Sequence, residues 1–249
     1  MCHGVDSRPP AAPAVSIAAE SSRVMLGMPD GSSLSAAIGL PIRHPRAGIV
    51  VLPDVRGLHG YYIALVDRLA EAGLAAIAID YFDRTAGPAE QSGRDGAFEY
   101  ATHLPSVSPE QVDSDTELAI AEIRRRTRLD LPVFVMGFCF GGSNAWRQAA
   151  SSLDLAGCIG FYGQPTRVGD AADSAARPTL MLIAGDDTFT EVDTQLALAA
   201  RMRAAGAEVT DIVFYGAPHS FFDRSSEQWD TACTEAWISI LAFVEQHAL

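Results

Sequence analysis

The stretch VFVMGFCFGG, Val133–Gly142, joins an apolar run to a helical pattern through a cysteine framed by glycines. This strand–turn–helix arrangement is typical of a nucleophile elbow, with Cys139 in the place where a serine usually stands. A Cβ two residues to either side of the nucleophile would crowd the adjoining strand or helix, which accounts for the glycines. The helix that follows directs its N-terminus at the thiol and favours the thiolate. The alternative is a buried, inert cysteine beside a glycine turn.

Outward from this stretch, short apolar runs alternate with longer segments of helical periodicity. The runs that read as buried strands are Gly48–Leu52, Leu74–Ile79, Val133–Gly137, Ala156–Phe161, Thr179–Ala184 and Asp211–Tyr215. The segments that read as helices are Tyr61–Glu71, Glu110–Arg126, Gly142–Ser152, Glu191–Ala204 and Glu227–Ala248. This alternation predicts an α/β fold, a mostly parallel sheet with helices on both faces.

The N-terminal part has a different pattern. Arg23–Leu26 and Ser33–Leu40, separated by a turn at Pro29-Asp30-Gly31, predict an antiparallel hairpin. We expect residues 1–20 to form a flexible tail and residues 21–249 to form a single domain, because no linker divides the chain. Thr85–Pro105 lacks clear periodicity and follows a strand, so it is either a partial lid or a surface excursion.

A nucleophile of this kind needs a base, and the base needs an acid that orients it. In the α/β-hydrolase fold the acid and then the histidine follow the nucleophile, each in a loop after a strand. Here one strand runs into Gly185-Asp186-Asp187, and a later strand runs into Pro218-His219. His219 is therefore the candidate base, and Asp186 and Asp187 compete as the acid, the other being a candidate helix N-cap.

The first parallel strand leads into a loop at Pro53–Gly57, where this fold places one amide of an oxyanion hole. We expect the backbone N–H groups of Val55 and Phe140 to be the two donors. Such donors stabilise the charge that develops on the attacked carbonyl oxygen.

Composition excludes several classes of protein. All 18 basic residues are arginine, so no lysine is present for a Schiff base or a phosphate-binding P-loop. A net charge of −13 disfavours nucleic acid and anionic membranes as partners. No apolar run reaches the ~20 residues that span a bilayer. The four cysteines form no C-x-x-C pair, which argues against a zinc site or a disulfide framework and favours a cytoplasmic location. We expect no metal and no organic cofactor.

These motifs together resemble the dienelactone hydrolase family, from about Gly48 to the C-terminus. The shared motifs are the elbow Gly137–Gly142, the turns Gly185-Asp186-Asp187 and Pro218-His219-Ser220-Phe221, and Asp80–Arg84. The resemblance implies an α/β-hydrolase with Cys139 as nucleophile, Asp187 as acid and His219 as base. It also implies that Arg84 binds a substrate carboxylate, for which a planar guanidinium is suited. The alternative is that Arg84 is a surface residue paired with Asp80 or Asp83.

The chain departs from the family pattern at two places. Asp54 stands where well-known members have a glutamate that helps to activate the thiol, and aspartate is one methylene shorter. A second carboxylate-binding arginine usually comes four residues after the histidine; here that position is Asp223, and Arg224 is one residue later. Arg56 is a candidate to compensate, or it pairs with Asp54.

The function expected from these residues is hydrolysis of an ester or enol-lactone through a thioester acyl-enzyme. The alternatives are a broad carboxylesterase or thioesterase with the same triad, and a ligand-binding protein on a hydrolase fold. A redox-sensing thiol would need a resolving cysteine, for which Cys158 is the candidate. We expect a small-molecule ester or lactone as the binding partner and a monomer or weak homodimer.

Overall fold

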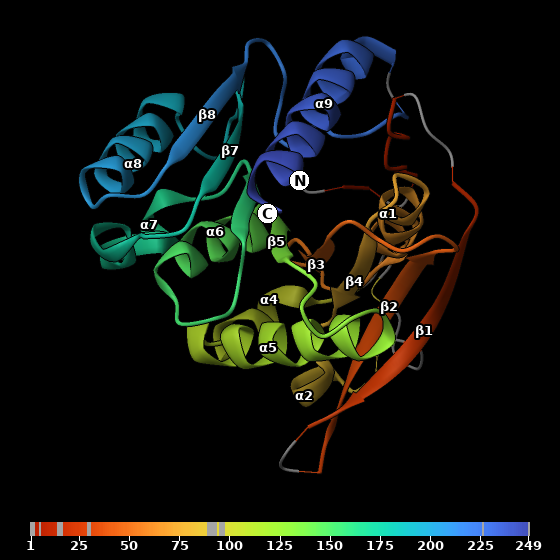
Figure 1. The fold of residues 1–249 in the computed structure, drawn as a ribbon. Coiled ribbons are helices and arrows are strands. Elements are labelled where there is room, and N and C mark those ends of the chain that lie inside the picture. Colours follow the sequence, from red (N-terminus) through yellow and green to blue (C-terminus); the bar gives the residue numbers. More distant parts are fainter. Residues whose placement is uncertain are drawn as a thin grey trace.

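The computed structural model describes residues 3–4, 6–13, 17–28, 31–88, 94, 98–225 and 227–248. Within these residues the fold is built on an eight-stranded sheet with the order β1-β2-β4-β3-β5-β6-β7-β8 (Figure 1). The strands are β1 (Ala19–Gly27), β2 (Ser33–Pro41), β3 (Gly48–Leu52), β4 (Ala75–Ile79), β5 (Val133–Phe138), β6 (Gly157–Phe161), β7 (Thr179–Ala184) and β8 (Val209–Phe214). β1 and β2 are antiparallel to their neighbours, whereas β3 to β8 run parallel to one another.

Helices cover both faces of the sheet (Figure 1). The longer helices are α1 (Gly60–Glu71), α5 (Pro109–Arg126), α6 (Phe140–Arg147), α8 (Val192–Ala204) and α9 (Asp230–His247). The shorter ones are α2 (Asp83–Ala86), α4 (Tyr100–His103) and α7 (Pro165–Val168), with 3-10 turns at Leu104–Ser106, Gln148–Ala150, Gly169–Ser174 and Glu227–Trp229. α1 and α9 pack on one face, and α5, α6 and α8 pack on the other, so the sheet separates two apolar cores.

The parallel strands are apolar throughout because both of their faces are buried. In β3, Ile49 and Val51 point into the core under α1 and α9, whereas Val50 and Leu52 point into the other core. The longest helix of the α5 face begins with the usual capping chemistry. At the start of α5 the Ser108 hydroxyl accepts from the backbone N–H of Gln111, and Pro109 occupies the first turn.

The predicted α/β fold is confirmed, with differences at the ends of elements. β3 and β7 have the predicted limits, whereas β8 begins at Val209, two residues earlier than the sequence pattern indicated. α6 begins at Phe140, directly after the cysteine, and ends at Arg147, where a 3-10 turn follows. The sequence pattern predicted a later start, at Gly142, because the first turn contains two glycines, which show no apolar periodicity.

The N-terminal hairpin is present, with β1 and β2 pairing along nine residues each. Pro29 and Asp30 of its predicted turn lie outside the described residues. In the segment Thr85–Pro105, residues 89–93 and 95–97 also lie outside them. The described remainder contains α4, and Arg94 is buried with its guanidinium 2.8 Å from the Asp80 carboxylate.

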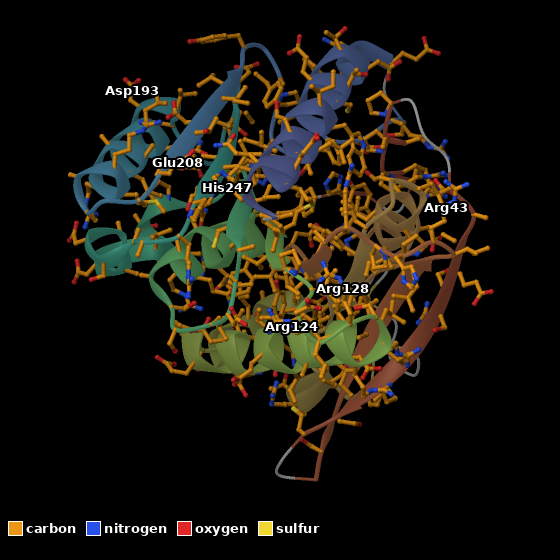
Figure 2. The ribbon with its side chains drawn as sticks, in the orientation of Figure 1. Arg43, Arg124, Arg128, Asp193, Glu208 and His247 are labelled. Carbon is orange, nitrogen blue, oxygen red and sulfur yellow. The ribbon has the colours of Figure 1, made fainter. Side chains whose placement is uncertain are left out.

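Side chains fill the space between the sheet and its helices, and ion pairs join elements at the rim (Figure 2). His247 at the end of α9 lies 3.8 Å from Glu208, just before β8. Arg124 near the end of α5 lies 2.8 Å from Asp154. Among the described residues, no helix has the length and apolar character to cross a membrane.

Candidate active site

Cys139 lies at the carboxyl end of the central strand β5, in a strained turn. Its φ of 53° and ψ of −109° fall where residues with a side chain are uncommon. A Cβ on Gly137 would lie 1.9 Å from the carbonyl oxygen of Gly141, and one on Gly141 would lie 2.0 Å from that of Leu52. The predicted reason for these glycines is therefore correct: the chain passes too close to itself for side chains.

The loops after β7 and β8 bring an acid and a histidine together. His219 Nδ1 lies 2.8 Å from Asp187 Oδ2, and both side chains are almost fully buried. The other oxygen of Asp187 accepts from the backbone N–H of Phe189 at 2.7 Å. With Nδ1 donating to the carboxylate, Nε2 is left as the basic nitrogen of a neutral imidazole. Asp186, the competing acid, is exposed and uses its backbone N–H to bond Ala217.

Cys139 and His219 line one cavity of about 360 Å³. The other lining residues are Gly4, Val55, Arg56, Tyr100, Phe140, Gln164, Arg167 and Phe189. β3 and β5 are paired with Leu52 opposite Gly137, so the loop after β3 emerges beside the elbow. Both residues predicted to supply oxyanion-hole amides, Val55 and Phe140, are therefore brought to the same cavity as the cysteine. Phe140 is the first residue of α6, so its N–H has no acceptor within the helix.

Asp54 is buried in a cluster of its own. Its Oδ1 accepts from the backbone N–H of Arg56 at 2.8 Å, and its Oδ2 lies 3.5 Å from His59 Nε2 and 3.8 Å from the Arg56 guanidinium. Burial opposes ionisation of Asp54, but the neighbouring His59 and Arg56 outweigh it, and its pKa lies below the usual value. Among the described residues no hydrogen bond joins Asp54 to Cys139, so thiol activation by Asp54 stays a prediction.

Two of the three predicted substrate-binding arginines lie away from the cavity lining. Arg84 donates to both oxygens of Asp115, a fully buried residue of α5, rather than to Asp80 or Asp83. Arg224 is exposed, and its backbone N–H bonds the carbonyl of Arg8. Only Arg56 of the three lines the cavity, where its guanidinium lies 3.0 Å from His59 Nε2.

The sequence reasoning missed several residues of the site. Arg167 of α7 lines the cavity, and its guanidinium lies 5.1 Å from the ring centroid of Phe140. Tyr162 follows β6 directly, and its ring centroid lies 4.7 Å from that of His219. Both residues follow β6, which ends at the same edge of the sheet as the elbow, so their position in the sequence could have predicted that they lie near the site. Gly4 lines the cavity too, and nothing in the N-terminal sequence indicated it.

Cys158 is a poor resolving thiol. Its side chain is fully buried in β6, and burial raises its pKa to about 12 against the weaker effect of Arg177. Cys139, Cys158 and Cys233 are all free thiols. Within the described part of the chain, no three histidine, cysteine or acidic side chains are grouped so that they could hold a metal ion.

Known proteins resemble this chain in sequence and in fold. A protein of Yersinia pestis named "Putative carboxymethylenebutenolidase" is 26% identical over 232 residues, covering 88% of this chain and 86% of its own. The crystal structure of a Klebsiella pneumoniae protein described as a "Putative Dienelactone Hydrolase" aligns with a TM-score of 0.80 at 23% identity, over 92% of this chain and 99% of that one. At that identity the structural likeness shows the fold alone.

A dienelactone hydrolase-like promiscuous phosphotriesterase from metagenomic libraries has the same fold, with a TM-score of 0.69 at 19% identity over 92% of this chain and 98% of its own. The model of the dienelactone hydrolase family matches residues 34–248, from β2 to the end of α9. The match includes the elbow and the two loops that carry Asp187 and His219. The chain belongs to the dienelactone hydrolase family of α/β-hydrolases.

Proposed function

We propose that this protein hydrolyses ester or enol-lactone bonds through a thioester formed on Cys139. The observation that carries the proposal is the hydrogen bond between His219 and Asp187 in the cavity that Cys139 also lines. A nucleophile on a strained elbow, a histidine and an acid that orients it form the arrangement of a triad. Membership of a hydrolase family supports the same reaction class.

The first half of the reaction forms the acyl-enzyme. His219 Nε2 takes the thiol proton, and the thiolate of Cys139 attacks the carbonyl carbon. The backbone N–H groups of Val55 and Phe140 donate to the oxygen that becomes negative. The tetrahedral intermediate collapses, the C–O bond to the leaving group breaks, and the imidazolium returns its proton to that oxygen. The product of this half is an alcohol or enol and a thioester on Cys139.

The second half releases the acid. His219 Nε2 takes a proton from water, and the hydroxide attacks the thioester carbonyl. The C–S bond breaks, the thiolate regains its proton from the imidazolium, and a carboxylic acid leaves. A thiolate is a good leaving group as well as a good nucleophile, so activated acyl groups suit this site better than amides.

The charges of the cavity favour an acidic substrate. Among the described residues its lining includes two arginines, Arg56 and Arg167, and no carboxylate, although the whole chain has a net charge of −13. Arg56 already lies near Asp54, whereas among the described residues Arg167 forms no ion pair. We therefore assign substrate binding to Arg56 and Arg167, in place of Arg84 and Arg224.

The aromatic part of the lining favours a second candidate with the same triad, a broad carboxylesterase or thioesterase. Tyr100, Phe140 and Phe189 give the cavity an apolar surface that neutral acyl chains could contact. The two candidates differ in whether a free carboxylate on the substrate lowers KM or leaves it unchanged.

The test is an assay of the wild-type protein, Cys139→Ala and the control variant Cys158→Ala. The substrates are an enol-lactone bearing a carboxylate, its methyl ester and p-nitrophenyl esters. Stopped-flow absorbance measures the burst of leaving group, and mass spectrometry of the quenched protein locates the acyl group. We expect a burst and an adduct on Cys139 in the wild type and in Cys158→Ala, and neither in Cys139→Ala.

The outcomes separate the candidates. Lower KM for the free acid than for its methyl ester supports the lactone hydrolase with an arginine-bound carboxylate, and equal KM values support the broad esterase. If Cys139→Ala turns over like the wild type and no adduct forms, Cys139 is not the nucleophile. Tight binding of the substrates without turnover would favour a ligand-binding protein.

A further inference from the structure

His3, near the N-terminus, lies inside the protein beside the active site. Its side chain is 1% exposed. The imidazole stacks on Tyr61, with ring centroids 3.6 Å apart and an angle of 11° between the planes, and Phe138 meets it edge-on at 6.1 Å. Its Nε2 lies 3.0 Å from the hydroxyl of Tyr162, 159 residues further along the chain. A buried polar ring with a specific partner is typical of a structural or functional contact rather than of a loose tail.

The segment around His3 is fixed at several points. The backbone N–H of Arg8 donates to Asp223 Oδ1 at 2.9 Å, and the carbonyl of Arg8 accepts from Arg224. The indole of Trp237 in α9 donates to the carbonyl of Pro10 at 3.0 Å. Asp223, which replaces an arginine of the family pattern, therefore holds this segment against the histidine loop. Whether other residues of 1–20 are flexible stays a prediction, but this part is packed.

Tyr162 connects His3 to the candidate base. It follows β6 with a φ of 36°, a strained conformation, and its backbone N–H donates to Leu182 in β7 at 2.9 Å. Its ring lies 4.7 Å from the ring of His219, while Phe189 meets that imidazole nearly at right angles at 5.0 Å. The two aromatic rings and the Asp187 carboxylate together set the orientation of His219.

We infer that His3 is a positioning residue of the active site: by bonding the hydroxyl of Tyr162, it fixes the ring that packs against His219. This inference rests on the proposed function, in which His219 acts as base and then as acid. Proton transfer requires the imidazole to be held in a productive geometry, and small misplacements lower the rate of the chemical step. The effect of His3 should therefore fall on kcat rather than on KM.

The contact between His3 and Tyr162 is one between neutral groups. Burial lowers the pKa of His3 to about 3, against the opposing effect of Asp54 and Asp223. The ring is therefore uncharged near neutral pH, with one nitrogen as donor and the other as acceptor. Its Nδ1 is buried without a hydrogen-bond partner among the described residues. Among the described residues, the imidazole of His3 therefore forms its hydrogen bond with the hydroxyl of Tyr162.

The experiment is a double-mutant cycle with His3→Phe, Tyr162→Phe and the double variant. Phenylalanine retains the stack of residue 3 on Tyr61 and the ring of residue 162 against His219, so each single variant removes the hydrogen bond between the two side chains and keeps their ring contacts. His44→Phe, at an exposed position, is the matched control. Steady-state kcat and KM for p-nitrophenyl esters are measured per active site, with sites counted from the burst and folding checked by circular dichroism.

We expect each single variant to lower kcat about ten-fold with little change in KM, and the double variant to be no slower than either, because all three lack the same bond. His44→Phe should equal the wild type. Wild-type kcat in His3→Phe, or effects that multiply in the double variant, would overturn the inference. If His3→Phe does not fold, Tyr162→Phe decides, since it leaves the buried imidazole in place, and wild-type kcat there has the same meaning.

Failure of the proposed function is a different result. In that case the wild type itself gives no burst and no adduct on Cys139, whatever residue 3 is. A wild type that turns over normally, together with an equally active His3→Phe, refutes the role of His3 alone.

Discussion

The two sides of Cys139 use their charged residues differently. On the side of β7 and β8, Asp187 bonds His219, and that histidine opens onto the cavity. On the side of β3 and β4, charged residues form buried ion pairs with one another: Arg84 bonds Asp115, and Arg94 bonds Asp80. Both sides are rich in ionisable groups, and the loop after β3 also brings Arg56 to the cavity, but neither of these two buried ion pairs is among the described residues that line it.

This difference shows why ion pairs near a nucleophile need not be functional. Asp115 is fully buried, and an unpaired carboxylate there is costly, so Arg84 is held where that charge requires it. The side chain of Asp187 is also buried, but its partner is a histidine that lines the cavity, and an imidazole, unlike a guanidinium, can act as both an acid and a base. We therefore expect substitutions on the side of β7 and β8 (the histidine side) to change catalysis, and substitutions of Arg84 on the side of β3 and β4 (the arginine side) to change stability.

The largest effect should come from breaking the histidine side at its acid. Asp187→Asn keeps the shape of the side chain but removes the charge that stabilises the imidazolium and selects the Nδ1–H tautomer. We expect kcat to fall about 10,000-fold, as triads respond to this substitution. Asp186→Asn, at the exposed neighbour, is the control and should stay within two-fold or so of the wild type. Steady-state hydrolysis of p-nitrophenyl esters is the measurement.

If both variants lose activity equally, the hydrogen bond between His219 and Asp187 does not distinguish the two acids. The candidate triad would then need a different third member. A selective loss in Asp187→Asn sharpens the contrast between the two sides.

The arginine side should respond in stability rather than in substrate preference. Arg84→Gln leaves Asp115 buried without its ion pair, and we expect it to lower the free energy of unfolding by about 2–3 kcal/mol. The matched variant Arg167→Gln removes a cation from the cavity and should leave stability within about 0.5 kcal/mol. It should raise KM for the carboxylate-bearing lactone about ten-fold and not for its methyl ester.

Urea unfolding and steady-state kinetics of both variants test this contrast. A rise in KM for the acidic lactone in Arg84→Gln, with no loss of stability, would mean that Arg84 leaves Asp115 to bind substrate. The assignment of substrate binding to Arg167 would then be wrong.

The sequence alone was sufficient for the sheet and for the residues placed by it. Cys139, Asp187 and His219 each follow a parallel strand, and the carboxyl ends of parallel strands meet at one edge. The fold class and the membership of the family followed from the same pattern. The choice of Asp187 over Asp186 did not, because both follow the same strand and only the turn decides which one faces the histidine.

Contacts between distant parts of the chain could not be predicted. Arg84 pairs with a residue 31 positions away on α5, and His3 with one 159 positions away. Such choices depend on how helices and termini pack, and hydrophobic periodicity contains no information about which of several acids a given arginine meets. For His3, a segment rich in proline and alanine indicated a loose tail, whereas in the structure its imidazole is buried against residues far along the chain.

Acid should weaken the protein through His3. Burial lowers the pKa of His3 from 6.5 to about 3, Asp54 and Asp223 opposing the shift and His59 and Arg56 adding to it. Between these values the unfolded chain binds a proton that the folded chain does not, so stability falls as pH drops below 6.5. The contribution of one such group is about 1 kcal/mol per pH unit.

Urea unfolding of the wild type and of His3→Phe at pH 6.5 and at about pH 4.5 measures this contribution. The free energy of unfolding should fall by about 2 kcal/mol more in the wild type than in the variant, because phenylalanine does not titrate. Parallel losses in the two proteins would mean that residue 3 takes up its proton in the folded state as readily as in the unfolded chain.

The smallest effect should come from narrowing the cavity at Gly4. A Cβ there would meet only the Ser7 hydroxyl, at an ordinary 3.9 Å, so a side chain fits and extends the wall formed by the N-terminal segment. Gly4→Leu should raise KM for long-chain p-nitrophenyl esters about three-fold and leave the acetate unchanged, because a leucine excludes about as much space as a few acyl methylenes. Gly27→Leu, on the exposed edge strand, is the control. If KM in Gly4→Leu equals that of the wild type at every chain length, the acyl chain does not reach Gly4.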